Sequence, residues 1–460
     1  MGRFRRIAAG TTIGAPVALV IAASWLIARP PELLSVGSGY AAKIVCSNVF
    51  IAGRDPDAVL ALDVQAPGHP LLRLMHQSVD RTEKTVTASL LGIFAPGYAA
   101  YREGFGCAGV PDGDFLAAQQ AVADVALPKI APPPADRPWP EGEKGSADPR
   151  LVPVLDDAAL LGPGMRGVVV IHDGRLAGER YGEGFSAAVP LLGWSITKTV
   201  NAALIGRLIQ DGRLSPLQSN LFADWQGDAR AKITVADLLA MQSGLAFNED
   251  YGAVTDVTRM LFLEPNMARF ASSLPLDANP GERFNYSSGT AVLLSHVFMN
   301  ALGDRWRALS YPASVLFAPL GMRSAVMETD ETGMFVGSSY MYATARDWAR
   351  FAQLLLDDGR WKGVRLLPEG FVTAMGTPTS VSDGAYSRVQ SWINGPGDVP
   401  NSRYGLPEDT FWMLGHDGQS IAVIPSRRIA VLRLGLTPAR LGYRSQELVR
   451  RVVDALAPAN

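Results

Sequence analysis

The chain is poor in residues on which several large classes of function depend. Only five histidines occur in 460 residues, and no two have the paired spacing of a zinc site. Neither a Walker loop nor a dinucleotide fingerprint is present. The formal net charge is -2 and the basic residues are dispersed, so nucleic acid is not an expected partner. We expect no metal and no cofactor.

Cysteine and lysine are also scarce. The two cysteines are Cys46 and Cys107. In an exported chain, two cysteines in one small region favour a disulfide, which would close a loop of about sixty residues and contribute about 4 kcal/mol in the chain-entropy model. Two buried free thiols are the alternative. Of the seven lysines, only Lys198 has a serine three residues before it.

That serine gives the first of three informative segments, Gly193-Trp194-Ser195-Ile196-Thr197-Lys198. Residues at positions i and i+3 share one face of a helix. The apolar run at 200–209 predicts a buried helix, and burial lowers the pKa of a lysine, so its amine can accept the proton of the serine hydroxyl. The alternative is a lysine extending from a helix end with the serine as N-cap. The segment lacks the second glycine of a Gly-x-Ser-x-Gly nucleophile elbow.

The second segment is Phe284-Asn285-Tyr286-Ser287-Ser288-Gly289, followed by a predicted apolar helix at 290–299. A tyrosine on a loop that opens a helix can present its phenol to a cavity. Near two cationic groups we expect the pKa of Tyr286 to fall, which would let it act as a phenolate base or as a proton relay. The alternative is core packing with the hydroxyl bonded to the backbone.

The third segment is Trp412-Met413-Leu414-Gly415-His416-Asp417-Gly418-Gln419-Ser420, followed by a predicted hairpin with strands at 421–424 and 429–434. Glycines in a strand let a substrate backbone approach closely, and edge N–H groups can bind an oxyanion. His416 is suited to contact a substrate carboxylate or to orient the proton relay. A glycine-rich turn with a solvated histidine is the alternative.

The order and separation of the three segments resemble the serine hydrolase superfamily of penicillin-binding proteins, class C β-lactamases and related esterases and amide hydrolases. The resemblance covers about residues 151–458. The segment Phe247-Asn248-Glu249-Asp250-Tyr251 and the Gly-His-Asp-Gly-Gln form of the third segment look most like 6-aminohexanoate-dimer hydrolases, which cleave short linear amides and carry esterase activity. The implied fold is α+β and β-lactamase/transpeptidase-like, an antiparallel sheet flanked by helices plus an all-helical subdomain.

The resemblance implies a role for each matched residue. Ser195 would be the acylated nucleophile, Lys198 its activating amine, and Tyr286 the general base and acid that passes a proton to the leaving group. The oxyanion hole would use the backbone N–H groups of Ser195 and Gln419. The further substrate-binding candidates are His416, Gly418, Ser288 and Tyr251, and Trp194, Phe247 and Trp392 are candidates to line the pocket.

Two positions depart from the penicillin-recognising pattern. Ser288 stands where those enzymes usually have asparagine, and His416 stands where they have lysine. A small-molecule ester or linear amide is therefore the expected substrate. Two alternatives stay open, namely a penicillin-binding DD-peptidase or β-lactamase type of activity on cell-wall peptides, and a catalytically silent envelope binding module. The intact set of Ser195, Lys198 and Tyr286 disfavours the silent module, because drift would be free to erase any of the three.

The amino terminus indicates the compartment. Arg3, Arg5 and Arg6 precede an uncharged stretch at 7–28. About twenty residues suffice to span a bilayer, and arginines on the N-terminal side favour a cytoplasmic N-terminus. We expect residues 1–30 to anchor the chain in the membrane of a bacterial-type cell envelope, with the remainder exported to the periplasm or outside the cytoplasm. A cleaved signal peptide, which would release a secreted protein, is the alternative.

Four parts are expected along the chain. The anchor at 1–30 is followed by a small N-terminal region at 31–130 that contains both cysteines, strand-like runs at 84–94 and 99–106, and a weak helix at 112–125. Residues 131–150 are proline-rich and are predicted to form an extended linker or strap. The hydrolase domain spans 151–460 and begins with a hairpin at 167–181 around Asp173-Gly174. The site is expected in the crevice between the sheet and the helical insertion.

Overall fold

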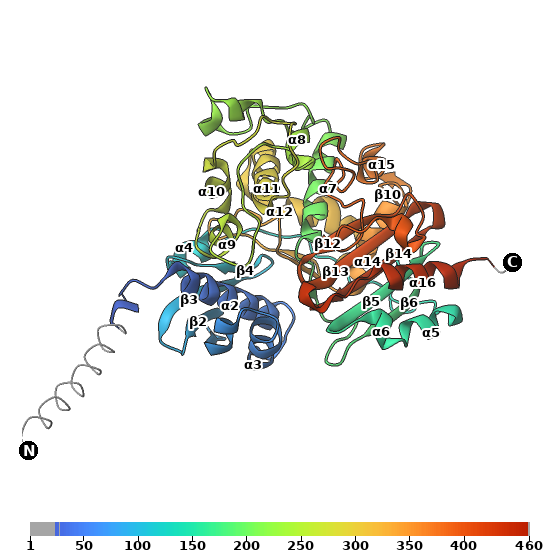
Figure 1. The fold of residues 1–460 in the computed structure, drawn as a ribbon, viewed down its shortest axis with the longest axis horizontal. Coiled ribbons are helices and arrows are strands. Elements are labelled where there is room, and N and C mark those ends of the chain that lie inside the picture. The colour runs from blue at the N-terminus through green and yellow to red at the C-terminus, as the bar shows by residue number, and fades with distance from the viewer. Residues whose placement is uncertain (1–23, 27, 459–460) are drawn as a thin grey trace, which may run out of the picture.

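The structure is a computed structural model that describes residues 24–26 and 28–458. Figure 1 shows a sheet with helices on its faces beside the C-terminus, a helical part above the middle of the molecule, and a smaller part near the N-terminus. The predicted α+β fold, with an antiparallel sheet flanked by helices and an additional helical part, is confirmed.

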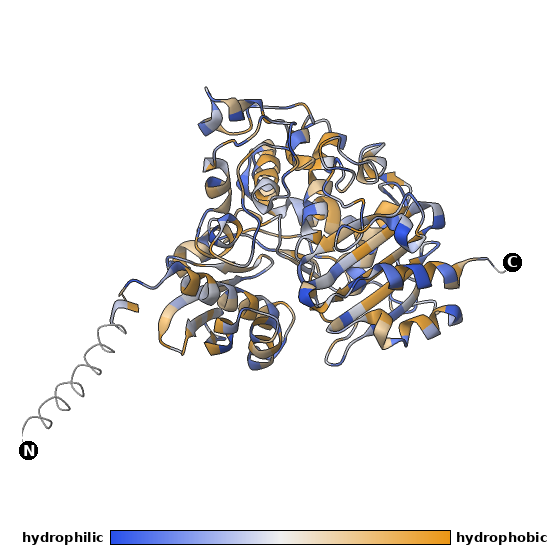
Figure 2. Cartoon of the chain, in the orientation of Figure 1, coloured by the Kyte–Doolittle hydropathy of each residue, from blue (hydrophilic) through white to orange (hydrophobic). Residues whose placement is uncertain are grey.

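A five-stranded antiparallel sheet with the strand order β12-β13-β14-β5-β6 forms the centre of the hydrolase region. Successive side chains of a strand point to opposite faces, so Val170 of β5 packs in the cluster under α16 (Gln446–Leu456), whereas Val169 and Ile171 face α14 (Ala345–Leu356). The apolar strands and the two-coloured α16 are visible in Figure 2. The strands are β5 (Met165–His172), β6 (Arg175–Tyr181), β12 (Phe411–Gly415), β13 (Gln419–Ile424) and β14 (Ile429–Gly435).

Both hairpins predicted in this sheet are confirmed. β5 pairs with β6 across the turn at Asp173-Gly174, and β13 pairs with β14 across the turn at 425–428. Strand β12 lies at one edge of the sheet, because only β13 pairs with it in the strand order. This edge faces the helical part and carries the third informative segment.

The helical part surrounds two buried helices that carry the other two segments. These are α7 (Ile196–Gln210) and α11 (Ser288–Leu302), which pack against each other. The predicted helices at 200–209 and 290–299 are thereby confirmed. The other helices of the hydrolase region are α5 (Val152–Leu155), α6 (Ala158–Leu161), α8 (Val235–Leu239), α9 (Asp256–Phe262), α10 (Met267–Ser273), α12 (Arg305–Pro312), α13 (Ala318–Leu320) and α15 (Phe371–Met375), and its short strands are β7 (Leu191–Leu192), β8 (Val326–Met327), β9 (Met341–Ala343), β10 (Arg360–Trp361) and β11 (Val364–Arg365).

The N-terminal region packs one long helix on a four-stranded antiparallel sheet, as Figure 1 shows at lower left. The helix is α2 (Glu32–Phe50), and the disulfide between Cys46 and Cys107 joins it to β4. The run predicted at 84–94 contains a strand at 85–90, the run predicted at 99–106 covers the end of a strand at 94–102 and the turn after it, and the helix predicted at 112–125 is shorter, at 115–120. The remaining elements of this region are β1 (Met75–Asp80), β2 (Thr85–Leu90), β3 (Phe94–Arg102), β4 (Gly106–Gly109), α3 (Pro56–Val59) and α4 (Phe115–Gln120).

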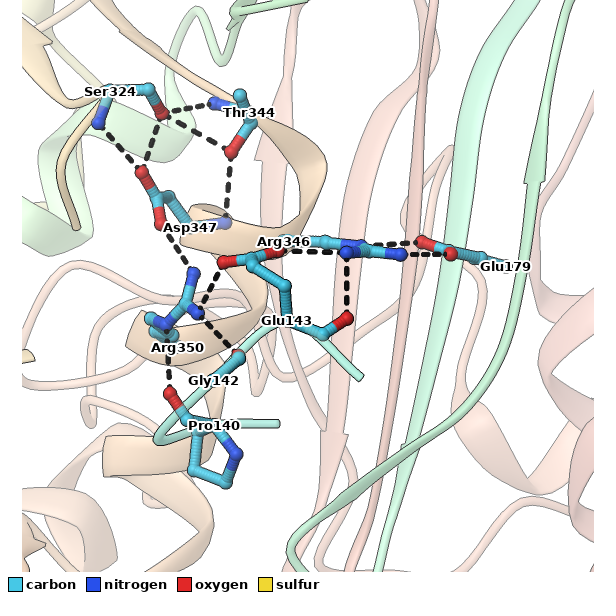
Figure 3. A network of polar contacts seen from close by, with 9 residues as sticks. All are labelled: Pro140, Gly142, Glu143, Glu179, Ser324, Thr344, Arg346, Asp347 and Arg350. Carbon is cyan, nitrogen blue, oxygen red and sulfur yellow. Dashed lines mark hydrogen bonds and ion pairs between the residues drawn. The ribbon is translucent and has the colours of Figure 1, made fainter. Parts of the chain in front are cut away.

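The proline-rich segment at 131–150 runs across the hydrolase region and is held by helix α14 (Figure 3). Glu143 accepts hydrogen bonds from Arg346 and Arg350, at 2.7 and 2.8 Å. Arg350, which is nearly fully buried, also donates to the backbone carbonyls of Pro140 and Gly142. Arginine suits this position because its rigid fork of donors serves several acceptors at once. The middle of the proline-rich segment is therefore held against the hydrolase region by hydrogen bonds and ion pairs.

The predicted membrane segment at 7–28 falls almost entirely outside the described residues. Among those that the structure describes, α2 is the one helix long and apolar enough to cross a bilayer. Most of α2 is buried against β2 and β3 and against the hydrolase region. Its apolar composition is therefore explained by packing inside the protein.

Candidate active site

Ser195 lies at the turn between β7 and the first residue of α7, at the end of the helix whose dipole attracts negative charge. Two neighbours shape this turn. A Cβ atom on Gly193 would lie 2.5 Å from the ring of Trp348, so only glycine fits there. Trp194 has a φ of +49°, a left-handed conformation that costs a side-chain-bearing residue about 1–2 kcal/mol. The turn places Ser195 on the wall of a cavity of about 390 Å³.

Lys198 lies one helical turn after Ser195 and is 1% exposed. Its amine donates to Ser195 Oγ at 3.0 Å, to Ser288 Oγ at 3.1 Å and to the backbone oxygen of Ser338 at 3.0 Å. All three acceptors are uncharged oxygens. Burial lowers the pKa of Lys198 to about 8, although Glu249 acts in the opposite direction. At neutral pH roughly a tenth of the amine is therefore neutral and able to take a proton.

Glu249 completes the polar group around the lysine, and the sequence analysis assigned it no role. Its carboxylate accepts from the backbone N–H of Ser288 at 2.7 Å, from the Ser288 hydroxyl at 2.5 Å and from the Tyr251 hydroxyl at 3.4 Å. The Ser288 hydroxyl thus accepts from Lys198 and donates to Glu249. Through these two hydrogen bonds Ser288 links the Glu249 carboxylate to the Lys198 amine without a direct ion pair between them.

Tyr286 lies on the loop directly before α11 and lines the same cavity as Ser195. Its ring centre is 4.7 Å from Lys198 Nζ, and its ring packs against Trp392 and Tyr386 at centroid distances of 5.0 and 5.7 Å. The expectation that its pKa falls is wrong. Burial raises the pKa of Tyr286, and the charge of Glu249 adds to this, whereas contact with Ser195 lowers it by less. The phenol therefore keeps its proton at neutral pH.

The third segment contributes the end of the edge strand β12. Leu414, Gly415 and His416 line the cavity beside Ser195. Behind them, Gly418 follows the turn and Gln419 begins β13, where the Gln419 side chain accepts from the backbone N–H of Gly435 at 2.8 Å and donates to the carbonyl of the same residue. The structure thus brings His416 to the cavity, whereas Gly418, at the end of the short turn 416–418, and Gln419, at the start of β13, are not among the residues that line it.

Aromatic rings surround the opening of the cavity. The ring of His416 lies 5.2 Å from that of Tyr251 and 5.4 Å from that of Trp194, between centroids. Tyr251 and Trp392 line the cavity itself. Phe247, by contrast, is buried against Gly289 of α11 and serves as core packing. The described residues contain no group of three or more histidine, cysteine, aspartate or glutamate side chains suited to a metal ion.

Comparison with known proteins finds similar sequences. The family model described as Beta-lactamase matches residues 158–440. A 6-aminohexanoate-dimer hydrolase from Paenarthrobacter ureafaciens is 26% identical over 272 residues, which cover 53% of this chain and 68% of that protein. Ser195, Lys198, Tyr286 and His416 all lie inside the range that the family model matches.

Two solved structures show the fold. A candidate 6-aminohexanoate-dimer hydrolase from Bacillus anthracis superposes with a TM-score of 0.55 at 21% identity, covering 75% of this chain and 93% of that one. A penicillin binding protein from Bacillus halodurans superposes with a TM-score of 0.50 at 17% identity, covering 67% of this chain and 100% of that one.

Proposed function

Because the chain belongs to the beta-lactamase family and has a hydrolase relative, we propose that it cleaves an ester or linear amide bond through an acyl-serine intermediate at Ser195. One observation carries the proposal. A buried lysine with a pKa of about 8 has its amine 3.0 Å from the serine hydroxyl, and all its hydrogen-bond acceptors are uncharged. This is the arrangement that activates a serine without a histidine.

Acylation would proceed in one concerted set of transfers. The neutral amine of Lys198 takes the proton from Ser195 Oγ, and the oxygen attacks the substrate carbonyl carbon. Tyr286 donates its phenolic proton to the departing alkoxide or amine, and recovers a proton from the Lys198 ammonium. The raised pKa of Tyr286 supports this role, because the phenol is protonated when the leaving group departs. Water then attacks the acyl-serine by the reverse sequence of transfers.

The oxyanion would be held by two backbone N–H groups. One belongs to Ser195 at the N-terminus of α7. For the second we place Leu414 ahead of Gln419. Trp412 in β12 exchanges both backbone hydrogen bonds with Trp392, away from β13, at 2.8 Å each. Along a strand the N–H groups two residues apart point to the same side, so the N–H of Leu414 is directed towards the cavity that Leu414 lines.

The substrate class follows from the residues that replace the β-lactam contacts. Ser288 has a hydroxyl where the penicillin-recognising enzymes have an asparagine amide. This hydroxyl is already bonded to both Lys198 and Glu249, so it is not free to bind a substrate. His416 presents an aromatic ring, tilted by 33° against that of Tyr251, where a lysine would present a charged amine. These features favour an uncharged ester or linear amide over a β-lactam. Rapid covalent labelling by penicillin would favour activity on cell-wall peptides instead.

We further propose that the catalytic region is exported and anchored through residues 1–30. The disulfide between Cys46 and Cys107 supports export, because disulfides persist in oxidising compartments. Its cysteines are 61 residues apart, so the disulfide closes a loop that contains most of the N-terminal region.

The proposed function is tested by the hydrolysis of p-nitrophenyl acetate and butyrate. We expect Ser195→Ala to lower kcat/KM by at least about 10³-fold, because it removes the hydroxyl beside the Lys198 amine that the proposal makes the nucleophile. Ser186→Ala removes an exposed serine hydroxyl and serves as the matched control. Equal activity of Ser195→Ala and the wild type would refute the proposal. A panel of linear amides, including the 6-aminohexanoate dimer, then separates ester from amide preference.

A further inference from the structure

A second cavity, of about 460 Å³, adjoins the cavity of Ser195 and is built largely by the N-terminal region. Its apolar lining includes Leu34 and Val36 of α2, Leu72 and Met75 beyond it, and Phe262 of α9. We propose that this cavity, called here the acyl groove, binds the alkyl chain of a medium-chain acyl group attached to Ser195. The inference rests on the proposed function and adds its substrate class, an ester or amide of a fatty acid of about eight to twelve carbons.

The acyl groove adjoins the reaction site, and the two cavities share part of their walls. Tyr251 and His416 line both cavities, and their rings lie 5.2 Å apart between centroids. Trp194, which directly precedes the nucleophile, lines the groove and packs edge-on against His416. The proposed path of an acyl chain on Ser195 runs over these three rings into the groove.

The groove lies on the acyl side of the nucleophile. Tyr286, the proposed proton donor to the leaving group, packs against Trp392 and Tyr386. The groove is bounded instead by Trp194, Tyr251 and His416. Because the leaving group departs towards its proton donor, the part of the substrate that stays on the serine extends the other way.

The lining selects alkyl chains by the hydrophobic effect. The lining surface is predominantly apolar, with leucine, valine, methionine and phenylalanine side chains, and His69, His416, Asp417 and Arg440 are its ionisable groups besides two tyrosines. Each methylene that leaves water for such a surface improves binding by about two- to fourfold. A cavity of this size lies in the range of small-molecule sites, which hold most of a ligand's surface.

The groove is held open by fixed contacts between the N-terminal region and the hydrolase region. Glu32 at the start of α2 forms an ion pair with Arg259 of α9 at 2.5 Å. The rings of Tyr40 and Phe262 meet edge to face with centroids 5.6 Å apart. At Gly39, a Cβ atom would lie 3.0 Å from the backbone oxygen of Phe262, which shows how closely α2 and α9 approach. The groove therefore exists before substrate binds.

The proposal is tested by a chain-length series of p-nitrophenyl esters, from acetate to decanoate, on the full chain in phosphatidylcholine nanodiscs, which avoid detergent in the groove. The readout is the ratio of kcat/KM for decanoate to that for acetate within each variant. We expect a ratio of at least ten in the wild type. We expect Ala253→Trp, at an exposed groove position, and Leu34→Trp each to lower this ratio at least tenfold.

The matched control is Leu116→Trp, which adds the same ring at an exposed leucine of α4 outside the groove and should leave the ratio unchanged. A flat series in the wild type, or an unchanged ratio in both groove variants, would overturn the proposal. If no ester is turned over at all, the proposed function fails but the groove is still tested by calorimetric titration with sodium decanoate against empty nanodiscs. Binding that is lost in Ala253→Trp and kept in Leu116→Trp supports the groove, and the absence of binding overturns it.

Discussion

Lys43 and Lys198 are both buried lysines, but they lie in different regions and have different partners. In the N-terminal region, Lys43 Nζ donates to the carboxylate of Glu328 at 2.6 Å and to Ser47 Oγ at 2.9 Å. In the hydrolase region, Lys198 donates to two serine hydroxyls and one backbone carbonyl. Burial lowers the pKa of both amines, but at Lys43 the adjacent carboxylate of Glu328 opposes this.

The difference shows how one side chain serves two purposes. A buried amine beside a carboxylate is held in its charged form, and the pair ties α2 to the segment that precedes β9. A buried amine among neutral oxygens loses little by giving up its proton, and it becomes a base. Glu249 could have made Lys198 into a second structural ion pair, but Ser288 stands between them. The predictions below test this contrast.

The largest expected effect is on catalysis at Lys198. We expect Lys198→Met to lower kcat/KM for p-nitrophenyl acetate by about 10²- to 10⁴-fold, because the serine loses its general base. The free energy of unfolding should change by less than about 2 kcal/mol, since the hydrogen bonds of the amine are lost while the cost of burying it is removed as well. Lys43→Met is the matched control and should keep kcat within about threefold once the folded fraction is measured. Equal losses of activity in both variants would contradict the contrast.

The next effect is on stability at Lys43. We expect Lys43→Met to lower the free energy of unfolding by about 3–5 kcal/mol, because it leaves Glu328 buried without its cation. Urea denaturation followed by tryptophan fluorescence measures this. The double variant Lys43→Met with Glu328→Gln should recover part of the loss, because the unpaired charge is then gone. If the two single losses simply add, the ion pair does not have the role assigned to it.

The smallest effect is a displacement of the pH profile. Activity requires the neutral amine of Lys198, so kcat/KM should rise with pH through about 8, the pKa of that group. Glu249 raises the pKa of Lys198, and Glu249→Gln should therefore move the rise to lower pH. Ester hydrolysis at constant ionic strength, corrected for the uncatalysed rate, gives both profiles. An unmoved profile would show that Ser288 does not couple the two residues.

The surroundings of Lys198 could in large part be predicted from local sequence, whereas those of Lys43 could not. The spacing of Ser195 and Lys198 and the apolar run after them predicted a buried lysine beside a serine, and the hairpins at 167–181 and 421–434 followed from alternating residues and turn chemistry. These features depend on a few neighbouring residues. The structure agrees with them because tertiary packing acts in the same direction as the local pattern.

The remainder depends on residues far apart in the chain. Lys43 and Glu328 are separated by 285 positions, and no local pattern connects them. The third acceptor of Lys198 is a backbone carbonyl at Ser338, which carries no sequence signal. The pKa of Tyr286 was predicted in the wrong direction because sequence reasoning counted charges and omitted burial by Trp392 and Tyr386. The long helix at 32–50 was not predicted because its apolar residues face several sides and give no amphipathic period.

The central claim is that Ser195 carries the acyl group, and trapping that group tests it most directly. The full chain is mixed with p-nitrophenyl butyrate, quenched in acid, and examined by intact-mass and peptide mass spectrometry. The account predicts one butyryl group on the peptide that contains Ser195, in the wild type and in Lys43→Met, and none in Ser195→Ala. An adduct on another residue, or the same adduct yield in Ser195→Ala, would contradict the account.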